Sequence, residues 1–295
     1  ASREAGAPVL LDRRASPSQP TPPVSANPAR LSHKEQDPLM ELTGSRILLT
    51  GASGGLGQAI ARRLARYGAH LTLTARNRPA LDSLADETRG TVVEADLAKR
   101  SDVQKLVKII GGFDVIIANA GVGGEAGGAE LGVKVIDGAL DVNLRAPMVL
   151  SGAFAQACIA AGRPGQIVLI GSLSGLAPTP DTCLYNATKF GLRGFGLSLR
   201  QDLEEHDVGV TMVEPGFIRD AGMFANGGIN LPQGIRTKSP SDVAQAVGKA
   251  IRASPAELFV APSELRAVVT LATVAPGISE AIQRRVGTKQ MRSGG

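Results

Sequence analysis

The chain has 295 residues, of which 43% are hydrophobic, 36 are glycine and 18 are proline, and this composition fits one large α/β domain with a sizeable core. Aromatic residues make up only 3% and tryptophan is absent, which argues against a surface that binds nucleic acid by stacking bases on aromatic rings. The net charge of +5 is poor support for a polyanionic partner, because several basic residues crowd the last dozen positions and indicate a solvated tail.

The first predicted segment, residues 1–39, is rich in Pro, Ser and Ala and lacks hydrophobic periodicity. We expect it to be a disordered extension, or a segment upstream of a natural start at Met40. It has no apolar stretch long enough for a signal peptide or a membrane span. Cys158 and Cys183 lie in apolar or helical contexts without C-x-x-C spacing, so we expect reduced core thiols in a cytoplasmic protein.

From residue 44 onward, short apolar runs alternate with longer amphipathic runs. A helix is predicted over residues 55–68. Seven apolar runs are typical of buried strands and lie at residues 46–50, 70–75, 91–95, 113–118, 165–170, 209–214 and 257–261. This alternation predicts a single α/β domain over residues 40–295, with a doubly wound, Rossmann-type parallel sheet covered by helices on both faces. Ligands of such sheets bind at the carboxyl ends of the strands.

The first predicted strand ends in the sequence "TGASGGLG", residues 50–57, which opens the predicted helix. Its glycines at positions 51, 55 and 57 let the backbone turn sharply and bring a helix N-terminus close to a pyrophosphate. A glycine-rich loop between a strand and a helix predicts a dinucleotide site.

The chain has only two tyrosines, and one of them, Tyr185, precedes Lys189 by four residues. On a helix this spacing places both side chains on one face, where the ammonium can act on the phenol. The spacing alone fits a helix surface pair equally well, so its meaning depends on the surrounding motifs.

The glycine spacing and the tyrosine–lysine pair together resemble the short-chain dehydrogenase/reductase family, from about Arg46 to Pro262. The motifs that carry the resemblance arrive in order: "TGASGGLG", "ADL" at 95–97, "NAG" at 119–121, Asn143 in "DVNL", Ser172 in "IGSLSG", "YNATK" at 185–189 and "PG" at 215–216.

The resemblance implies an oxidoreductase that interconverts a carbonyl and a secondary alcohol, with four catalytic residues. Tyr185 would be the general acid or base, and Lys189 would lower the phenol's pKa, which is otherwise near 10. Ser172 would hydrogen-bond the substrate oxygen, and Asn143 would hold a water that links Lys189 to solvent.

The residues after the second predicted strand, "TARNR", predict NADP(H) rather than NAD as the cofactor. Arg76, with Asn77 and Arg78, can pair with a 2′-phosphate, which a carboxylate would repel. Two departures from the family pattern are Gly54, where many NADP-using relatives have a basic residue, and Asp220, where a threonine is usual. The cofactor residues that the resemblance implies are Thr50, Gly51, Ser53, Gly55, Leu56, Gly57, Arg76, Asn77, Asp96, Leu97, Asn119, Ala120, Gly121, Tyr185, Lys189, Pro215, Gly216 and Ile218.

The sequence indicates only the chemical class of the substrate. Residues 217–238 carry several large apolar side chains among glycines and could close over the site as a lid, which favours a hydrophobic ketone or a 3-oxoacyl compound. The same segment could also simply pack on the sheet. We expect a homodimer or homotetramer, with residues 265–278 as a packing or interface helix, and neither a metal site, a nucleic-acid partner nor a membrane span.

Two alternatives belong to other classes. One is an NADP-binding sensor that has the reductase fold and no turnover, although such proteins typically lose the tyrosine or the lysine. The other is a serine hydrolase, suggested by "GSLSG". In that sequence Leu173 occupies the position that the G-x-S-x-G nucleophile motif requires to be serine.

Overall fold

The computed structural model describes residues 40–123, 131–179, 181–221, 236–275 and 277. Its strands are β1 (Arg46–Thr50), β2 (His70–Thr74), β3 (Thr91–Val92), β4 (Val115–Ala118), β5 (Gly165–Ile170), β6 (Val208–Pro215) and β7 (Glu257–Val260). Its helices are α1 (Gly55–Arg66), α2 (Arg78–Thr88), α3 (Arg100–Ile109), α4 (Val133–Leu140), α5 (Ala146–Ala160), α6 (Cys183–Asp202), α8 (Pro240–Ala253) and α9 (Ser263–Val274). Short helical turns are η2 (Ile110–Gly112), η4 (Asp141–Arg145) and η5 (Leu173–Gly175).

Among the described residues, the strands form one seven-stranded parallel sheet in the order β3-β2-β1-β4-β5-β6-β7. The chain proceeds outward from β1 on one side and then crosses to β4 on the other. The predicted doubly wound architecture is therefore confirmed. Because the order reverses between β1 and β4, the crevice at the carboxyl ends of these strands is the expected ligand site.

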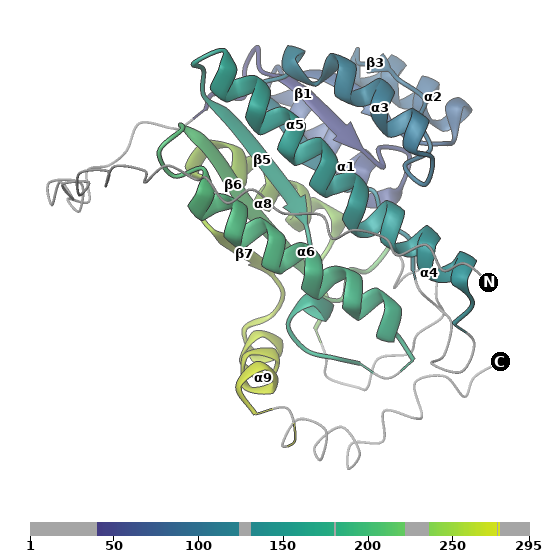
Figure 1. Cartoon of the computed structure of the whole chain (residues 1–295), viewed down its shortest axis with the longest axis vertical. Coiled ribbons are helices and arrows are strands. Elements are labelled where there is room, and N and C mark those ends of the chain that lie inside the picture. Colours follow the sequence, from purple (N-terminus) through teal and green to yellow (C-terminus); the bar gives the residue numbers. More distant parts are fainter. Residues whose placement is uncertain (1–39, 124–130, 180, 222–235, 276, 278–295) are drawn as a thin grey trace, which may run out of the picture. The chain divides into compact units, whose positions relative to one another are not determined.

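Helices cover both faces of the sheet, as Figure 1 shows with α5 and α6 in front of it and α1 and α8 behind. Alternate residues of β1 serve the two cores: Ile47 and Leu49 pack with α1 and α8, whereas Leu48 packs with α3 and α5. All three are fully buried. A strand buried on both faces has no polar side to mark it, which explains the continuous apolar runs of the sequence.

The predicted strands at 46–50 and 165–170 match β1 and β5, and the other predicted boundaries need correction. The edge strand β3 ends at Val92 instead of 95, although Val93 and Ala95 still donate to carbonyls of the β2 segment, at 3.0 and 3.2 Å. β4 begins at Val115 instead of 113. β2 and β7 each end one residue before the prediction, and β6 is one residue longer at both ends. The helix predicted over 55–68 ends at Arg66, because Gly68 takes a φ of +77° that reverses the chain.

The prediction of core cysteines holds for one residue and fails for the other. Cys158 is fully buried against β5, whereas Cys183 is exposed at the first position of α6. No helix in the described part of the chain is both long and apolar enough to cross a bilayer.

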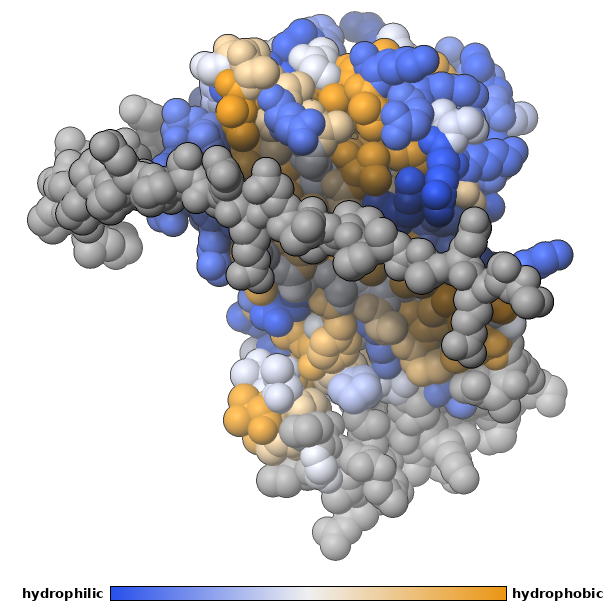
Figure 2. Space-filling view, in the orientation of Figure 1, coloured by the Kyte–Doolittle hydropathy of each residue, from blue (hydrophilic) through white to orange (hydrophobic). Residues whose placement is uncertain are grey.

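The predicted helix over residues 265–278 corresponds to α9. Val269 and Ala272 are buried against the turn that follows β5, while Val268, Leu271 and Val274 are exposed, and apolar side chains gather on this helix in Figure 2. The N-terminal extension and most of the predicted lid lie outside the described residues. The described ends of the lid segment are paired, since Ile218 bridges Lys238 as a parallel neighbour.

Candidate active site

The glycine-rich loop is tied to the end of β4 by two neutral side chains. Thr50 Oγ1 accepts hydrogen bonds from the backbone N–H groups of Asn119 and Ala120, at 3.0 and 3.1 Å. The Asn119 amide in turn donates to the carbonyls of Thr50 and Gly51, at 3.0 and 3.1 Å. These reciprocal bonds fix the loop at the switch point of the sheet.

Two glycines of the loop are required by space. A Cβ at Gly51, which has a φ of +65°, would lie 2.7 Å from the Ala120 Cα. A Cβ at Gly57 would lie 2.2 Å from the Gly51 carbonyl oxygen. Gly54 differs, because its nearest contact would be an ordinary 3.5 Å. The loop therefore packs its own backbone at 51 and 57 and leaves room at 54.

The first turn of α1 has features that suit a bound phosphate. No side chain caps it and it contains no acidic residue, whereas α2 is capped by Asn77 and α8 by Ser239 with Asp242. The first N–H groups of a helix have no partner within the helix and carry its positive partial charge. An uncapped N-terminus at the crevice, opened by Gly55, Leu56 and Gly57 and preceded by Ser53, fits the pyrophosphate of a dinucleotide.

The three polar residues after β2 have different surroundings. Asn77 accepts from the Ala80 N–H at 3.1 Å, and Arg78 pairs with Asp82 at 2.7 Å. Arg76 is exposed, and no ion-pair partner for it occurs among the described residues. Arg76 is thus the guanidinium of this group that can still bind an anion.

The segment after β3 supplies one buried and one polar residue. Leu97 is buried, and Asp96 accepts from the Ala98 N–H at 3.1 Å, so its carboxylate shapes its own turn. The backbone N–H of Asp96 donates to Asp102 at 3.0 Å.

Tyr185 and Lys189 lie one turn apart near the start of α6. The Lys189 ammonium is 5.7 Å from the centroid of the Tyr185 ring, and it donates to the Ile170 carbonyl at 2.8 Å. Lys189 is buried, and burial lowers its pKa to about 8 even though the carboxylate of Glu214 opposes the shift. Gly175 permits this packing, since a Cβ there would lie 2.8 Å from the Lys189 carbonyl oxygen.

Ser172 follows β5 and faces the tyrosine. Its hydroxyl accepts from the Ser174 N–H at 3.1 Å. Burial raises the pKa of Tyr185 to about 12; a hydrogen bond from Ser172 opposes the shift and the charge of Glu214 adds to it. The phenol consequently keeps its proton throughout the neutral pH range.

Asn143 occupies the π-helical turn η4, where its side chain joins two segments. Its Oδ1 accepts from the Val122 N–H at 2.8 Å, and its Nδ2 donates to the Val122 carbonyl at 2.9 Å and to Thr188 Oγ1 at 3.2 Å. Both side-chain atoms are therefore bonded within the protein. The residue four positions later, Pro147, has no N–H with which to bond the Asn143 carbonyl.

The site contains a charged residue that sequence analysis did not single out. Glu214 is fully buried at the end of β6, and its Oε2 accepts from the Ser172 N–H at 2.5 Å. Burial raises the pKa of Glu214 to about 7, and Lys189 and the Ser172 N–H oppose the shift. The signal was present, because an acid inside the apolar run "GVTMVE" is unusual for a buried strand.

Pro215 is the last residue of β6, and Gly216 and Ile218 follow it. The Gly216 N–H donates to the Val260 carbonyl at 3.1 Å, and Ile218 is buried. Asp220 has a φ of +65°, and its carboxylate is 74% exposed and 3.5 Å from Arg219.

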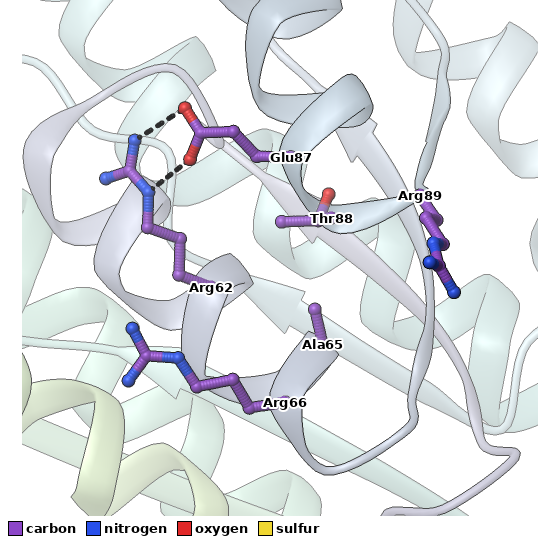
Figure 3. Close-up of a pocket in the computed structure, with 6 residues that line it drawn as sticks. All are labelled: Arg62, Ala65, Arg66, Glu87, Thr88 and Arg89. Carbon is purple, nitrogen blue, oxygen red and sulfur yellow. Dashed lines mark hydrogen bonds and ion pairs between the residues drawn. The ribbon is translucent and has the colours of Figure 1, made fainter.

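A separate hollow of about 400 Å³ lies on α1 and α2, away from the predicted catalytic residues. Figure 3 shows Arg66 and Arg89 beside the ion pair of Arg62 with Glu87, whose Nε to Oε2 distance is 2.6 Å. Ala65 and Thr88 complete its lining. Exposed charged side chains define this hollow, so it has the character of a solvated surface.

Comparison with known proteins gives a consistent result. The family model for short chain dehydrogenases matches residues 45–229. The chain is 32% identical over 183 residues to the 3-oxoacyl-(acyl-carrier-protein) reductase FabG of Rickettsia conorii, covering 61% of this chain and 76% of the relative. It is 31% identical over 245 residues to the ketoacyl reductase HetN of Nostoc sp., covering 80% of this chain and 85% of the relative.

A solved structure of a metagenomic short-chain oxidoreductase in complex with NADP is 32% identical and superimposes with a TM-score of 0.64. The match covers 76% of this chain and 100% of that one.

Proposed function

The chain belongs to the short chain dehydrogenase family of oxidoreductases, and from that premise we propose that it interconverts a carbonyl and a secondary alcohol with NADP(H), using Tyr185 as the general acid or base. The observation that carries the proposal is the packing of Tyr185, Lys189 and Ser172 at the carboxyl end of β5, at the same edge of the parallel sheet as the uncapped first turn of α1.

NADPH, when bound, supplies the hydride. Tyr185 supplies the proton, because a phenol with a pKa near 12 is protonated at neutral pH and can donate to the carbonyl oxygen. Ser172 holds the same oxygen with its hydroxyl, where negative charge develops. In the oxidation direction Tyr185 accepts a proton instead, and the Ser172 hydrogen bond favours its phenolate.

Lys189 is suited to returning a proton to Tyr185. Its pKa near 8 lets it gain and lose a proton close to neutral pH, and its ammonium lies under the phenol ring. The side chain of Asn143 bonds to Val122 and Thr188. A water that connects Lys189 with solvent would therefore bind at the backbone carbonyl of Asn143, to which Pro147 offers no N–H.

NADP(H) is proposed over NAD on the strength of Arg76. It is exposed directly after β2, and the residues beside it are engaged in capping α2 and in an ion pair with Asp82. A guanidinium binds the 2′-phosphate with charge-assisted hydrogen bonds. The NADP complex of the similar solved structure supports this choice.

The proposed substrate is a hydrophobic ketone or a 3-oxoacyl compound. The floor beside Ser172 is apolar, because Leu173, Leu176 and Ala177 pack there with α9. Two of the similar proteins are named as reductases of ketoacyl or 3-oxoacyl substrates. Self-association and a cytoplasmic location stay predictions.

The test is a kinetic screen. Purified protein with saturating NADPH is assayed against a chain-length series of ketones and 3-oxoacyl thioesters, with sugars and small charged keto acids as comparison substrates. We expect kcat/KM to rise with apolar chain length. NADPH binding with no oxidation across the whole panel would instead support the NADP-binding sensor, and a preference for polyols would reject the apolar substrate class.

A further inference from the structure

Glu214 is a buried charge that none of the roles above employs. It is the last residue but one of β6 and is fully buried. Because side chains alternate along a strand, Glu214 shares the face of Val210 and Met212, which packs toward α6. This orientation directs its carboxyl to the catalytic side of the sheet.

The surroundings of Glu214 are shaped for a carboxyl group. Its Oε2 accepts the Ser172 N–H, and a Cβ at Gly171 would lie 2.1 Å from the same oxygen. Gly171 therefore provides the space that the carboxyl occupies. Its Oε1 has no hydrogen-bond partner among the described residues. Burial of an incompletely bonded carboxyl destabilises the fold, so a role in the active site offers a reason for its presence.

The groups that face Glu214 are mixed in charge. From α6 come Lys189 and Arg193, and from β7 comes Glu257, which bonds Arg193 at 2.7 and 3.0 Å. The helix α8 contacts the other face of β6 with apolar residues such as Val243 and Val247.

The charge of Glu214 acts on both titrating members of the catalytic group. Burial is the main cause of the raised pKa of Tyr185 and of the lowered pKa of Lys189; the negative charge of Glu214 adds to the first shift and opposes the second, because it disfavours the phenolate and favours the ammonium. The ion pair of Arg193 with Glu257 is largely self-neutralised, so it does not replace this charge.

We propose that Glu214 is a positioning residue for the reaction: its bond to the Ser172 amide fixes the turn that carries the Ser172 hydroxyl, and its negative charge adds to the burial that keeps the proton on Tyr185. The inference rests on the proposed function, and it assigns two separable properties to one side chain. The length of the Glu214 side chain fixes the position of Ser172, and the charge of its carboxylate contributes to the pH at which Tyr185 ionises.

The role of the Glu214 charge is tested by titrating Tyr185, which needs no catalytic turnover. The only other tyrosine is Tyr67, which is exposed, and tryptophan is absent, so Tyr67→Phe leaves Tyr185 as the sole phenol that absorbs as tyrosinate. In this background, with NADP⁺ bound, Glu214→Gln should shift the tyrosinate titration to lower pH by about one unit. Glu87→Gln removes a carboxylate that is exposed and paired with Arg62, and it should leave the titration unchanged.

The reach is tested by kinetics. Glutamine keeps an oxygen for the Ser172 N–H and loses the charge. In the pH profile of kcat, Glu214→Gln should therefore keep the plateau value within about threefold, while the fall of kcat at alkaline pH moves to lower pH. Aspartate keeps the charge and is one methylene shorter. Glu214→Asp should therefore lose about tenfold in kcat, while the pH at which kcat falls on the alkaline side stays as in the wild type. Melting temperature and NADPH affinity report whether each variant is folded.

The outcomes separate the inference from the proposed function. If the wild type reduces no carbonyl, the function fails, and the tyrosinate titration still decides whether Glu214 sets the proton on Tyr185. An unchanged titration in folded Glu214→Gln overturns the charge role. If Glu214→Gln does not fold, Glu214→Asp remains decisive, because wild-type kcat in that variant overturns the positioning role.

Discussion

The carboxyl ends of β1 and β2 and those of β5 and β6 open on the same crevice but are built from different groups. At β1 the loop is held by Thr50 and Asn119, which carry no charge, and the cation Arg76 is exposed. At β5 and β6 the pKa values of Tyr185, Lys189 and Glu214 all depart from their ordinary values through burial.

The difference follows from the task of each region. Binding a polyanion needs N–H groups and a cation that remain open to it, and these are provided by backbone shape. Proton transfer needs ionisable groups whose charged forms are costly, and burial provides that. Changes at β1 should therefore alter binding, and changes at β5 and β6 should alter proton transfer.

Tyr185→Phe should give the largest separation of the two regions. Loss of the proton donor should lower kcat by about 10²- to 10⁴-fold, while NADPH affinity stays within about threefold. Steady-state kinetics and fluorescence titration of NADPH measure the two quantities. Tyr67→Phe is the matched control, since Tyr67 is exposed and its ring contacts Arg63 and Arg252. Near-normal turnover in Tyr185→Phe would reject the proton-transfer role.

The pH dependence of stability should distinguish the regions next. The pKa of Glu214 is raised to about 7 in the fold, above its value in the unfolded chain, so the folded state favours the neutral acid. The resulting stability is fully present below about pH 4.5 and is lost as pH rises through about 7, by up to about 3 kcal/mol.

Urea unfolding at pH 5 and pH 8 checks this sign. Glu214→Gln should gain stability relative to the wild type as pH rises, because glutamine has no carboxylate to desolvate. A difference between the two proteins that is constant with pH would contradict the buried-acid assignment.

Gly57→Ala should damage the nucleotide side by steric means. Its Cβ would lie 2.2 Å from the Gly51 carbonyl, so the loop must shift, at a cost of about 2 kcal/mol in unfolding free energy. NADPH affinity should fall with it. Gly54→Ala is the matched control, because its Cβ would make only an ordinary contact. Equal effects of the two substitutions on stability and affinity would show that the loop is not constrained as described.

Arg76→Gln should have the smallest effect, confined to one cofactor. NADPH affinity should fall by about 1.5 kcal/mol, or tenfold, because the site is exposed and screened, and NADH affinity should not change. Arg78→Gln should alter neither, since Arg78 already pairs with Asp82. Calorimetric titration of the wild type and both variants with both cofactors gives the affinities, and a wild type that prefers NADH would show that Arg76 does not select NADP(H).

How far the sequence could predict the molecule differs between the same two regions. The doubly wound parallel sheet was predictable from the alternation of apolar strands and amphipathic helices. The glycine loop was predictable because Gly51 and Gly57 act through backbone geometry that the T-G-x-x-x-G-x-G spacing records. The short length of β3 was not predictable from the sequence. An edge strand ends where its hydrogen bonds to the neighbouring strand β2 end, and the apolar character of the local sequence does not indicate that point.

The sequence motifs indicated the candidate catalytic side chains, but they did not indicate the charged group that acts on the pKa values of these side chains. Glu214 comes 42 residues after Ser172 and bonds its amide only because β5 and β6 are neighbours in the sheet. The motif predicted that Asn143 holds a water, but it did not indicate that the side-chain amide of Asn143 bonds to Val122 and Thr188. Such long-range contacts follow from strand adjacency and not from spacing along the chain.

Isotope transfer tests the central claim most directly. Wild-type protein is incubated with NADPH that carries deuterium on the transferring face of the nicotinamide, together with the best ketone or 3-oxoacyl substrate of the screen, and the product is analysed by mass spectrometry. We predict one deuterium on the new carbinol carbon for each NADPH oxidised, and none without the protein. Oxidation of NADPH without deuterium in the alcohol, or no oxidation with any carbonyl that the screen contains, would contradict a hydride-transferring carbonyl reductase.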